Sequence, residues 1–466
     1  MSTHVFSLLR DARRARKEGP VGIARRQRAR FAEIVAHARA HSPFYRELYR
    51  DVPAPVETPS QVPMTNKKGL MARFDDWVTD REITLEKVRA FISEPAAIGE
   101  RFLDRYTALT TSGTTGVPGI FVWDDRTMAV TTVLALRMLR EWLGAREVFR
   151  IIARGGRITM VCATSGHYAE AVAGARLQEK RGREKAQVLP AHAPVAELVA
   201  QLNAFGPDVL APYASIGALL AEEQIGGRLR IKPVFIVLSA EGLPESGYDR
   251  IEKAFNVPVH HSYAATECPF ISYSCDHGWL HVNSDWVLLE PVDSEYRPVS
   301  PGMLSHTVLV TNLANQVQPV VRYDLGDRLL LRPDPCECGS VLPAIRVEGR
   351  TADVLAFPTE HGQQVSIPAL MFEVVDTPEV ALFQIVQTRP TIVRVRLRFA
   401  PGADPERVWP AVDREIRRVL AAHGLGHVTI ERAHEPPEQS AGGKYRSVIS
   451  HAEYIKHGSV AEGRQS

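Results

Sequence analysis

The chain has 466 residues, of which 45% are hydrophobic and 24% are charged. This balance is that of a folded globular protein and excludes a disordered chain, a collagen and a small disulfide scaffold. At about 150 residues per domain, the length predicts two or three domains. Lys and Arg number 56 against 54 Asp and Glu, so the chain lacks the basic excess of a dedicated nucleic-acid binder.

The N-terminal arm is locally basic, with nine Lys or Arg and two acids in residues 1–30. An Arg-rich transit peptide and a helix that packs on the protein both fit this arm, and the helix is favoured. No run of about 18 apolar residues occurs, so we expect no membrane partner. The five scattered cysteines do not form a disulfide framework, which indicates a cytoplasmic location.

Helical periodicity over residues 27–50 is broken at His41–Tyr45, because Pro43 disfavours a continuous helix. Between residues 150 and 265, short apolar runs alternate with helical stretches, which predicts βαβ units and a parallel sheet. The expected strands are Arg157–Ala163, Asp208–Ala211 and Val234–Leu238, and the expected helices are Val195–Ala204 and Ile216–Glu223.

The pattern changes twice further along the chain. Residues 280–350 contain short apolar segments between Pro, Gly and Asn turns, which predicts an antiparallel, barrel-like region. After Arg350, the alternation over Val393–Phe399 predicts a half-buried strand, and a helix with one apolar face follows it. We therefore expect an α/β protein with two domains, residues 1–349 and a small α+β unit at residues 350–466.

The segment Thr110–Gly119 (TTSGTTGVPG) alternates small hydroxyl residues with glycines. Glycines let the backbone approach a ligand closely, and hydroxyls and amides donate hydrogen bonds to phosphate oxygens. The segment lacks the Lys of the GxxxxGK[ST] loop. A bare Ser/Thr/Gly run fits a flexible polar turn equally well. The motifs that follow it in a fixed order favour a phosphate loop.

Four further segments follow the loop in a fixed order: Tyr263–Glu267 (YAATE), Arg322–Asp327 (RYDLGD), Gly349–Arg350 with Asp353, and Gly443–Arg446 (GKYR). With Thr111–Pro118 as the phosphate loop, they resemble the Tyr-Gly-x-Thr-Glu, Arg-Tyr-x-x-Gly-Asp, hinge and catalytic-lysine motifs of the acyl-adenylate-forming superfamily. This superfamily contains acyl-CoA synthetases, peptide synthetase adenylation domains and luciferases. His41–Tyr45 and Pro335–Gly339 (PCECG) are typical of its phenylacetate–CoA ligase and coenzyme F390 synthetase branch.

The resemblance implies a large adenylation domain and a small mobile C-terminal domain that meet at Arg350. It implies that ATP activates a carboxylic acid as an acyl-AMP, and Tyr168 and Tyr213 would suit an aromatic or planar acid. Coenzyme A then accepts the acyl group. An amine, another nucleophile or a carrier protein are alternative acceptors, and a catalytically silent nucleotide-binding homologue is an alternative of another class. The resemblance to this branch also favours a homodimer.

The resemblance also assigns roles to single residues. Lys444 would bridge the attacking carboxylate and the α-phosphate, Thr266 would donate to that phosphate, and Glu267 would bind Mg²⁺. Gly119 stands where many members have a Lys. The expected nucleotide residues are Thr111, Ser112, Gly113, Thr114, Thr115, Gly116, Ala240, Glu241, Tyr263, Asp327 and Arg350, and the expected acid-pocket residues are His167, Tyr213, Ser215 and Ala240.

Four residues form a candidate metal site: Cys275, His281, Cys336 and Cys338. Three thiolates and one imidazole suit tetrahedral Zn²⁺, and four protein ligands would leave no open position for catalysis. The expected role is therefore structural, with His277 or Cys268 as substitute ligands. Reduced thiols beside a surface His fit the spacing equally well.

Overall fold

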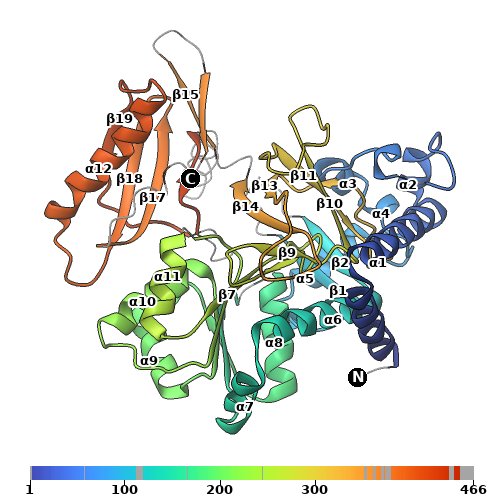
Figure 1. The fold of residues 1–466 in the computed structure, drawn as a ribbon, viewed down its shortest axis with the longest axis horizontal. Helices are drawn as coiled ribbons and strands as arrows, with labels where there is room; N and C mark the ends of the chain where they lie inside the picture. Colours follow the sequence, from blue (N-terminus) through green and yellow to red (C-terminus); the bar gives the residue numbers. More distant parts are fainter. Residues whose placement is uncertain are drawn as a thin grey trace.

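The computed structural model is a mixed α/β protein in which a smaller C-terminal part stands beside a larger body (Figure 1). The predicted fold class is confirmed. Within the residues described below, no helix combines the length and the apolar character needed to span a lipid bilayer. The structure describes residues 3–56, 58–111, 119–164, 166–243, 245–350, 354–359, 364–368, 372, 379–439 and 445–451.

A nine-stranded sheet forms the centre of the body, in the order β13-β14-β9-β8-β7-β6-β5-β3-β4. Strands β4, β3, β5, β6 and β7 are parallel, and pairing is antiparallel from β7 onward to β13. The expected apolar runs form β3, β5 and β6. The nine strands are β3 Ile158–Cys162, β4 Ala186–Pro190, β5 Val209–Pro212, β6 Phe235–Leu238, β7 Val259–Tyr263, β8 Ser272–Ser274, β9 Leu280–Val282, β13 Asp327–Leu331 and β14 Ala344–Arg350.

Helices connect the parallel strands, as the alternating pattern predicts. On α9, the buried residues Leu198, Val199 and Leu202 form the apolar face that packs on the sheet. Because β3, β5, β6 and β7 are parallel, their carboxyl ends share one edge of the sheet, where ligands of such folds bind. These helices are α8 Ala169–Arg181, α9 Val195–Phe205, α10 Ala214–Ile225 and α11 Glu245–Phe255.

Helix α1 (Thr3–His41) bends at Gly19–Pro20, where Gly19 has φ 68° and ψ −160°. Pro20 lacks the N–H that a continuous helix would use. The basic arm is therefore a helix that packs on the body, as favoured from its sequence, and it buries Ala15 and Ile23. The predicted break also occurs, because Ser42 caps the next helix and Pro43 is its first residue.

The remaining helices of the body precede the sheet in the sequence. On α6, Val130, Val133, Leu134 and Met138 form a buried stripe. These helices are α2 Pro43–Leu48, α3 Lys67–Ala72, α4 Phe74–Trp77, α5 Leu85–Ile92, α6 Asp125–Trp142, α7 Ala145–Ala153 and the 3₁₀ turns η1 Pro59–Gln61 and η2 Pro95–Ala97.

Two smaller antiparallel sheets complete the body. The sequence predicts antiparallel strands between residues 280 and 350, and β10, β11 and β12 pair in this way. A separate hairpin, β1 paired with β2, brackets the predicted phosphate loop. The strands are β1 Thr107–Thr110, β2 Ile120–Trp123, β10 Val287–Val292, β11 Thr307–Asn312 and β12 Tyr323–Asp324.

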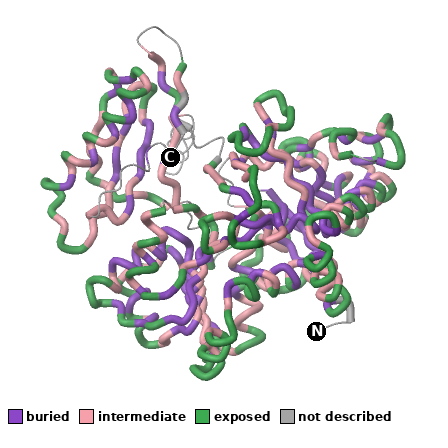
Figure 2. Tube along the Cα trace, in the orientation of Figure 1, coloured by how far each residue is buried: buried purple, intermediate pink, exposed green. Residues whose placement is uncertain are grey.

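The C-terminal part has a core of its own, shown by the purple segments of its strands and helix in Figure 2. Helix α12 buries Val408, Val412, Ile416 and Val419 against a four-stranded sheet of order β19-β18-β17-β20. The predicted alternating strand is β18. The boundary between residues 349 and 350 remains a prediction. The elements are β15 Val354–Pro358, β16 Gln364–Pro368, β17 Val380–Arg389, β18 Ile392–Phe399, α12 Pro405–Ala422, β19 Thr429–Arg432 and β20 Val448–Ile449.

Candidate active site

The predicted phosphate loop begins and ends at two residues that bind each other. The Thr111 N–H donates to the Gly119 carbonyl at 2.9 Å, and the Gly119 N–H donates to Thr111 Oγ1 at 2.8 Å. The Thr111 hydroxyl therefore closes the base of the loop. Between them, Ser112, Gly113, Thr114, Thr115 and Gly116 lie outside the described residues.

Gly119 stands where many members of the superfamily have a Lys, and its surroundings leave little room for a larger side chain. A Cβ at this position would lie 2.8 Å from a carbon of the Phe121 ring and 3.4 Å from Cε of Lys67. A larger side chain would therefore clash with the ring. Lys67, the first residue of α3, therefore brings the end of its side chain close to the base of the loop. Sequence reasoning missed Lys67, because nothing in its local sequence indicates this proximity.

Tyr263 and Asp327 meet at the sheet edge. Tyr263 ends β7 and Asp327 begins β13, and the Tyr263 hydroxyl donates to Asp327 Oδ2 at 2.5 Å. Asp327 is buried, and its strand partner in the ladder is Arg350. The predicted adenine residue and the predicted ribose residue are thus neighbours. The Arg350 side chain lies outside what the structure describes.

Glu267 is buried and oriented by two partners. The Tyr323 hydroxyl donates to Glu267 Oε1 at 3.1 Å, and the Asn312 amide donates to the Glu267 carbonyl at 3.1 Å. The neighbouring Thr266 is fixed through its carbonyl, which accepts from the Trp123 indole at 3.0 Å. Tyr323 belongs to the RYDLGD motif, so this contact links the second and third motifs of the chain.

Glu241 connects the body to the C-terminal part. One carboxylate oxygen accepts from the Ser215 N–H at the start of α10, at 2.9 Å, and the other accepts from the Tyr445 N–H. An anionic group at a helix N-terminus is favoured by the helix dipole. The preceding Ala240 is exposed and has φ 70°, so it forms the tight turn after β6. Tyr445 directly follows Lys444, which lies outside the described residues.

Gln384 holds the segment that flanks Lys444 from within the C-terminal part. Its buried amide nitrogen donates to the carbonyls of Glu438 and Arg446, at 3.1 and 2.9 Å. Its oxygen accepts from the Glu438 N–H at 3.1 Å. Gln439 and Tyr445 also form a β-bridge. The chain is therefore held in place on both sides of Lys444, at Glu438–Gln439 and at Tyr445–Arg446.

The three predicted acid-pocket residues other than Ala240 are buried at the same sheet edge. Tyr213 is fully buried, and its hydroxyl accepts from the Ala163 N–H at 3.1 Å. Ser215 Oγ has no hydrogen-bond partner among the described residues, which is unusual for a buried hydroxyl. His167 packs on Phe91 with ring centroids 5.3 Å apart, and burial lowers the pKa of its ring. His167 is therefore neutral near pH 7.

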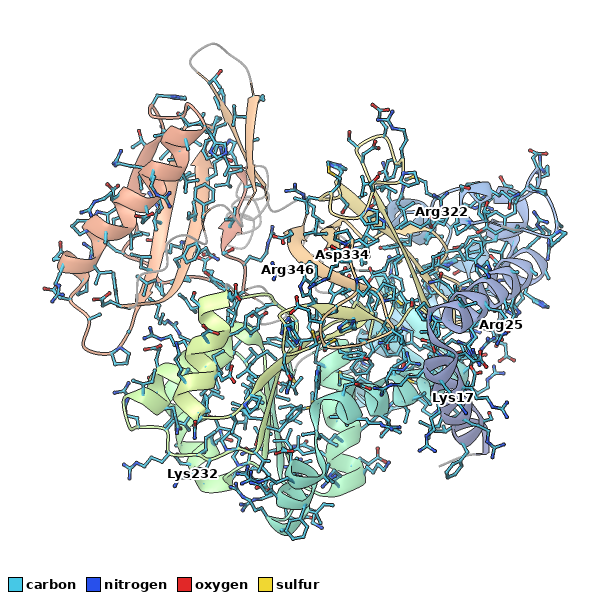
Figure 3. All side chains as sticks on the ribbon, viewed as in Figure 1. Lys17, Arg25, Lys232, Arg322, Asp334 and Arg346 are labelled. Atoms are coloured by element: carbon cyan, nitrogen blue, oxygen red, sulfur yellow. The ribbon has the colours of Figure 1, made fainter. Side chains whose placement is uncertain are left out.

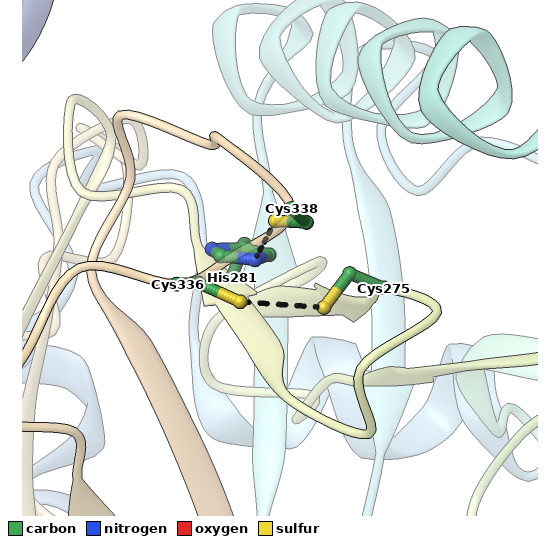
Figure 4. A group of neighbouring side chains, drawn as sticks. All are labelled: Cys275, His281, Cys336 and Cys338. Carbon is green, nitrogen blue, oxygen red and sulfur yellow. Dashed lines mark hydrogen bonds between the residues drawn. The ribbon is translucent and has the colours of Figure 1, made fainter.

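The four predicted metal ligands meet in space (Figure 4). Their ligand atoms lie within 4.8 Å of one another. Cys275 and His281 come from the β8–β9 hairpin, and Cys336 and Cys338 come from the loop before β14. The Cys275 and Cys336 sulfurs are 3.8 Å apart, and Cys338 Sγ is 3.0 Å from His281 Nε2.

The geometry of this cluster fits a tetrahedral thiolate site. Two thiolates bound to one Zn²⁺ at about 2.3 Å stand about 3.8 Å apart, which matches the Cys275–Cys336 spacing. His281 Nδ1 lies 3.1 Å from the Leu342 carbonyl, so Nδ1 carries the proton and Nε2 is left to bind a metal.

The two substitute ligands lie apart from the cluster. His277 is exposed and has Glu337 at 3.8 Å. Cys268 is buried beside Glu267, and this burial raises the pKa of its thiol. The set predicted first is therefore the set that the fold brings together.

The class of fold is that of the adenylate-forming ligases. The structure of 2-hydroxyisobutyryl-CoA ligase in the postadenylation state, in complex with R3-HIB-AMP, has a TM-score of 0.65 with this chain. It is 19% identical and the match covers 94% of this chain and 91% of that one. The anthranilate CoA ligase AuaEII in complex with anthranoyl-AMP has a TM-score of 0.50, at 16% identity over 76% and 67% of the two chains.

Sequence comparison adds two curated relatives. Phenylacetate-coenzyme A ligase of Thermus thermophilus is 24% identical over 381 residues, 78% of each chain. Protein CapK of Staphylococcus aureus is 29% identical over 136 residues, which is only 28% of each chain. No known protein-family model matches the chain. The chain thus has the acyl-adenylate-forming fold and is a relative of phenylacetate–CoA ligase, as its motifs indicated.

Proposed function

We propose that the protein is an ATP-dependent, AMP-forming acid–CoA ligase. The observation that carries the proposal is the meeting of separate motifs at one sheet edge: Tyr263 with Asp327, Glu267 with Tyr323, and Glu241 with the residue that follows Lys444. The sequence relationship to phenylacetate-coenzyme A ligase supports the same reaction class. We place the body at residues 1–349 and the C-terminal domain at residues 350–466.

The first step joins two anions. A carboxylate oxygen of the acid attacks the α-phosphorus of ATP, and the bond to the leaving pyrophosphate breaks. Lys444 would lie between the two anions and offset their repulsion, and Thr266 would donate to the α-phosphate. Such charge stabilisation in a site that excludes water is the main source of rate in reactions of this kind. Asp327 would hold the ribose hydroxyls, and Tyr263 would lie against the adenine.

Positive charge near the β- and γ-phosphates would come from two sources in this chain. Lys67 reaches the base of the phosphate loop from α3 and would supply the charge that Gly119 lacks. Mg²⁺, held by Glu267, would screen the same phosphates, because Mg²⁺ prefers carboxylate and phosphate oxygens. The Tyr323 hydroxyl would keep the Glu267 carboxylate turned toward the ion.

The second step transfers the acyl group from AMP to the thiol of coenzyme A. The sulfur attacks the acyl carbon, the bond to AMP breaks, and the thiol proton is released to solvent. An aromatic or planar acid would suit the buried ring of Tyr213. The Ser215 hydroxyl, which has no hydrogen-bond partner within the described part of the chain, would offer the acid a hydrogen bond.

We assign a structural Zn²⁺ to Cys275, His281, Cys336 and Cys338. Its four ligands would tie the β8–β9 hairpin to the loop before β14. The same sheet carries Tyr263 at the end of β7, so the ion would stiffen the support of the nucleotide site. Thiolate ligands require reduced cysteines, in keeping with a cytoplasmic location.

The test is AMP release from ATP across a panel of aryl and alkyl acids, with coenzyme A, hydroxylamine or no acceptor. We expect one class of acids to release AMP, and coenzyme A to raise turnover above the level with acid alone. Turnover raised by hydroxylamine and not by coenzyme A would show that the acid is activated and that its acceptor is a nucleophile other than coenzyme A, because hydroxylamine captures any acyl-adenylate. No AMP release with any acid would favour a nucleotide-binding homologue without activity.

A further inference from the structure

A cavity of about 260 Å³ lies between helix α1, helix α6 and residues 340–342. We call it the α1–α6 cavity, and α1, which forms one of its walls, lies across the body from the C-terminal part in Figure 1. Its volume is close to the lower end of the range of about 300–1,000 Å³ found for small-ligand pockets. None of the residues assigned to the proposed reaction lines it.

The inner wall of the α1–α6 cavity is apolar. The buried side chains of Ala15, Ile23, Val133 and Leu342 line it, and Tyr273 forms part of the same wall. Both halves of α1 contribute to this wall, since Ala15 precedes the bend at Gly19–Pro20 and Ile23 follows it. An apolar body of a ligand would replace water there at a gain in free energy.

The charged residues of the cavity leave an excess of positive charge at its mouth. The buried Asp285 is neutralised by Arg137, with two oxygen–nitrogen distances of 2.7 Å, and Glu141 is paired with Arg16. Arg13 and Arg140 also line the cavity and are exposed. Within the described residues, neither has an acidic partner.

One exposed cation next to the cavity adds to this charge. Lys17, which follows the lining residue Arg16, projects from α1 into solvent (Figure 3), whereas Arg25 on the same helix is paired with Glu18 at 2.6 Å. The formal charge of the whole chain is only +2. The cavity therefore opens at one of the positively charged regions of an almost neutral molecule, and such a region attracts anions more strongly at low ionic strength.

We propose that the α1–α6 cavity is a second ligand site, which binds a small amphiphilic anion with one acidic group and a short apolar body. The apolar body enters between Ala15, Val133 and Leu342, and the acidic group stays at the mouth between Arg13 and Arg140. The proposal does not depend on the acid-ligase reaction, because the site is built from other residues.

The test is calorimetric titration of the full chain at low salt with four probes that separate charge from apolar character. Octanoate carries both features, octan-1-ol lacks the charge, octylammonium reverses it, and inorganic phosphate lacks the apolar body. We expect octanoate to bind at least about tenfold more tightly than the other three. Equal binding of octanol and octanoate, or no octanoate binding, would overturn the proposal.

Two pairs of variants separate this cavity from the acid pocket near Tyr213. The double variant Arg13→Glu with Arg140→Glu reverses the charge at the mouth of the cavity. The double variant Arg146→Glu with Arg150→Glu makes the same charge change on the exposed helix α7 and is its control. Ala12→Trp fills the cavity, and Val21→Trp is the control on the exposed face of α1. We expect the affinity for octanoate to fall about tenfold in the charge-reversed variant and in Ala12→Trp, and to stay unchanged in both controls. Octanoate binding that survives both the charge-reversed variant and Ala12→Trp would place the probe elsewhere and contradict the proposal.

Discussion

The proposed nucleotide side of the active site (Tyr263, Asp327, Glu267 and Glu241) and the cysteine–histidine cluster lie on the same sheet but are assembled in different ways. The cluster is local to β8, β9 and the loop before β14, and its four ligand atoms already lie within 4.8 Å of one another. The nucleotide side joins distant segments through single hydrogen bonds, such as those from Tyr323 to Glu267 and from Tyr445 to Glu241.

This difference predicts two kinds of behaviour. A site closed by local geometry contributes to stability, because a bound metal holds neighbouring segments together. A site assembled across the body and the C-terminal part can be broken at one contact without unfolding the protein. Variants on the nucleotide side should therefore change rates, and variants in the cluster should change stability first.

The largest expected effect is on catalysis. Lys444→Ala removes the charge that would stabilise the two approaching anions, so we expect acyl-adenylate formation to fall about 10²–10³-fold. The dissociation constant of ATP should change less than about twofold. Pyrophosphate exchange and nucleotide titration measure the two quantities. Lys253→Ala, an exposed lysine on α11, is the control. An unchanged exchange rate would remove Lys444 from the mechanism.

The cluster should show the opposite pattern. Cys336→Ser should lower the zinc content from about one equivalent per chain to near zero, and should lower the free energy of unfolding by about 3 kcal/mol. Metal analysis and denaturant titration check this. Cys268→Ser, at a buried thiol outside the cluster, should keep its zinc. If the unmodified protein purified with zinc in the medium holds none, the assignment is wrong.

A smaller effect should separate the two lysines at the start of α3. Lys67→Ala should raise the KM for ATP about tenfold, since it removes one charge near the phosphates. Lys68→Ala, at the next and exposed position, should leave the KM unchanged. Steady-state kinetics at varied ATP would measure both. Equal KM values in the two variants would show that Lys67 does not serve the phosphate loop.

The smallest expected effect concerns the contact between the body and the C-terminal part. Gln has one acceptor oxygen where Glu has two, so Glu241→Gln must give up one of its two backbone partners. We expect kcat for acyl-adenylate formation to fall about fivefold, the size of one modest hydrogen bond, with ATP affinity unchanged. A weaker ATP affinity at unchanged kcat would instead assign Glu241 to adenine binding.

Much of the fold could be predicted from local sequence. The apolar runs that became β3, β5 and β6 are short and bounded by turns, so their period and length identify them. Pro43 ended α1 for a local steric reason. The bend at Gly19–Pro20 was not predicted, because the helical pattern continues on both sides of it.

The site was predicted unevenly. The cluster follows from ligand chemistry and spacing, because few residue types bind Zn²⁺. The roles of Lys444, Glu267 and Asp327 came from the resemblance alone. Lys67, Tyr323 and Gln384 were missed, since each lies against a residue that is remote in sequence, and only the folded chain brings the two together.

The reaction proposed for this chain is the activation of a carboxylic acid with ATP. Acid-dependent exchange of labelled pyrophosphate into ATP tests it most directly, with no acceptor present. We expect exchange that requires both an acid and Mg²⁺ and that is lost in Lys444→Ala. Exchange that proceeds without any acid, or its absence across aryl and alkyl acids in a preparation that still binds ATP, would contradict it.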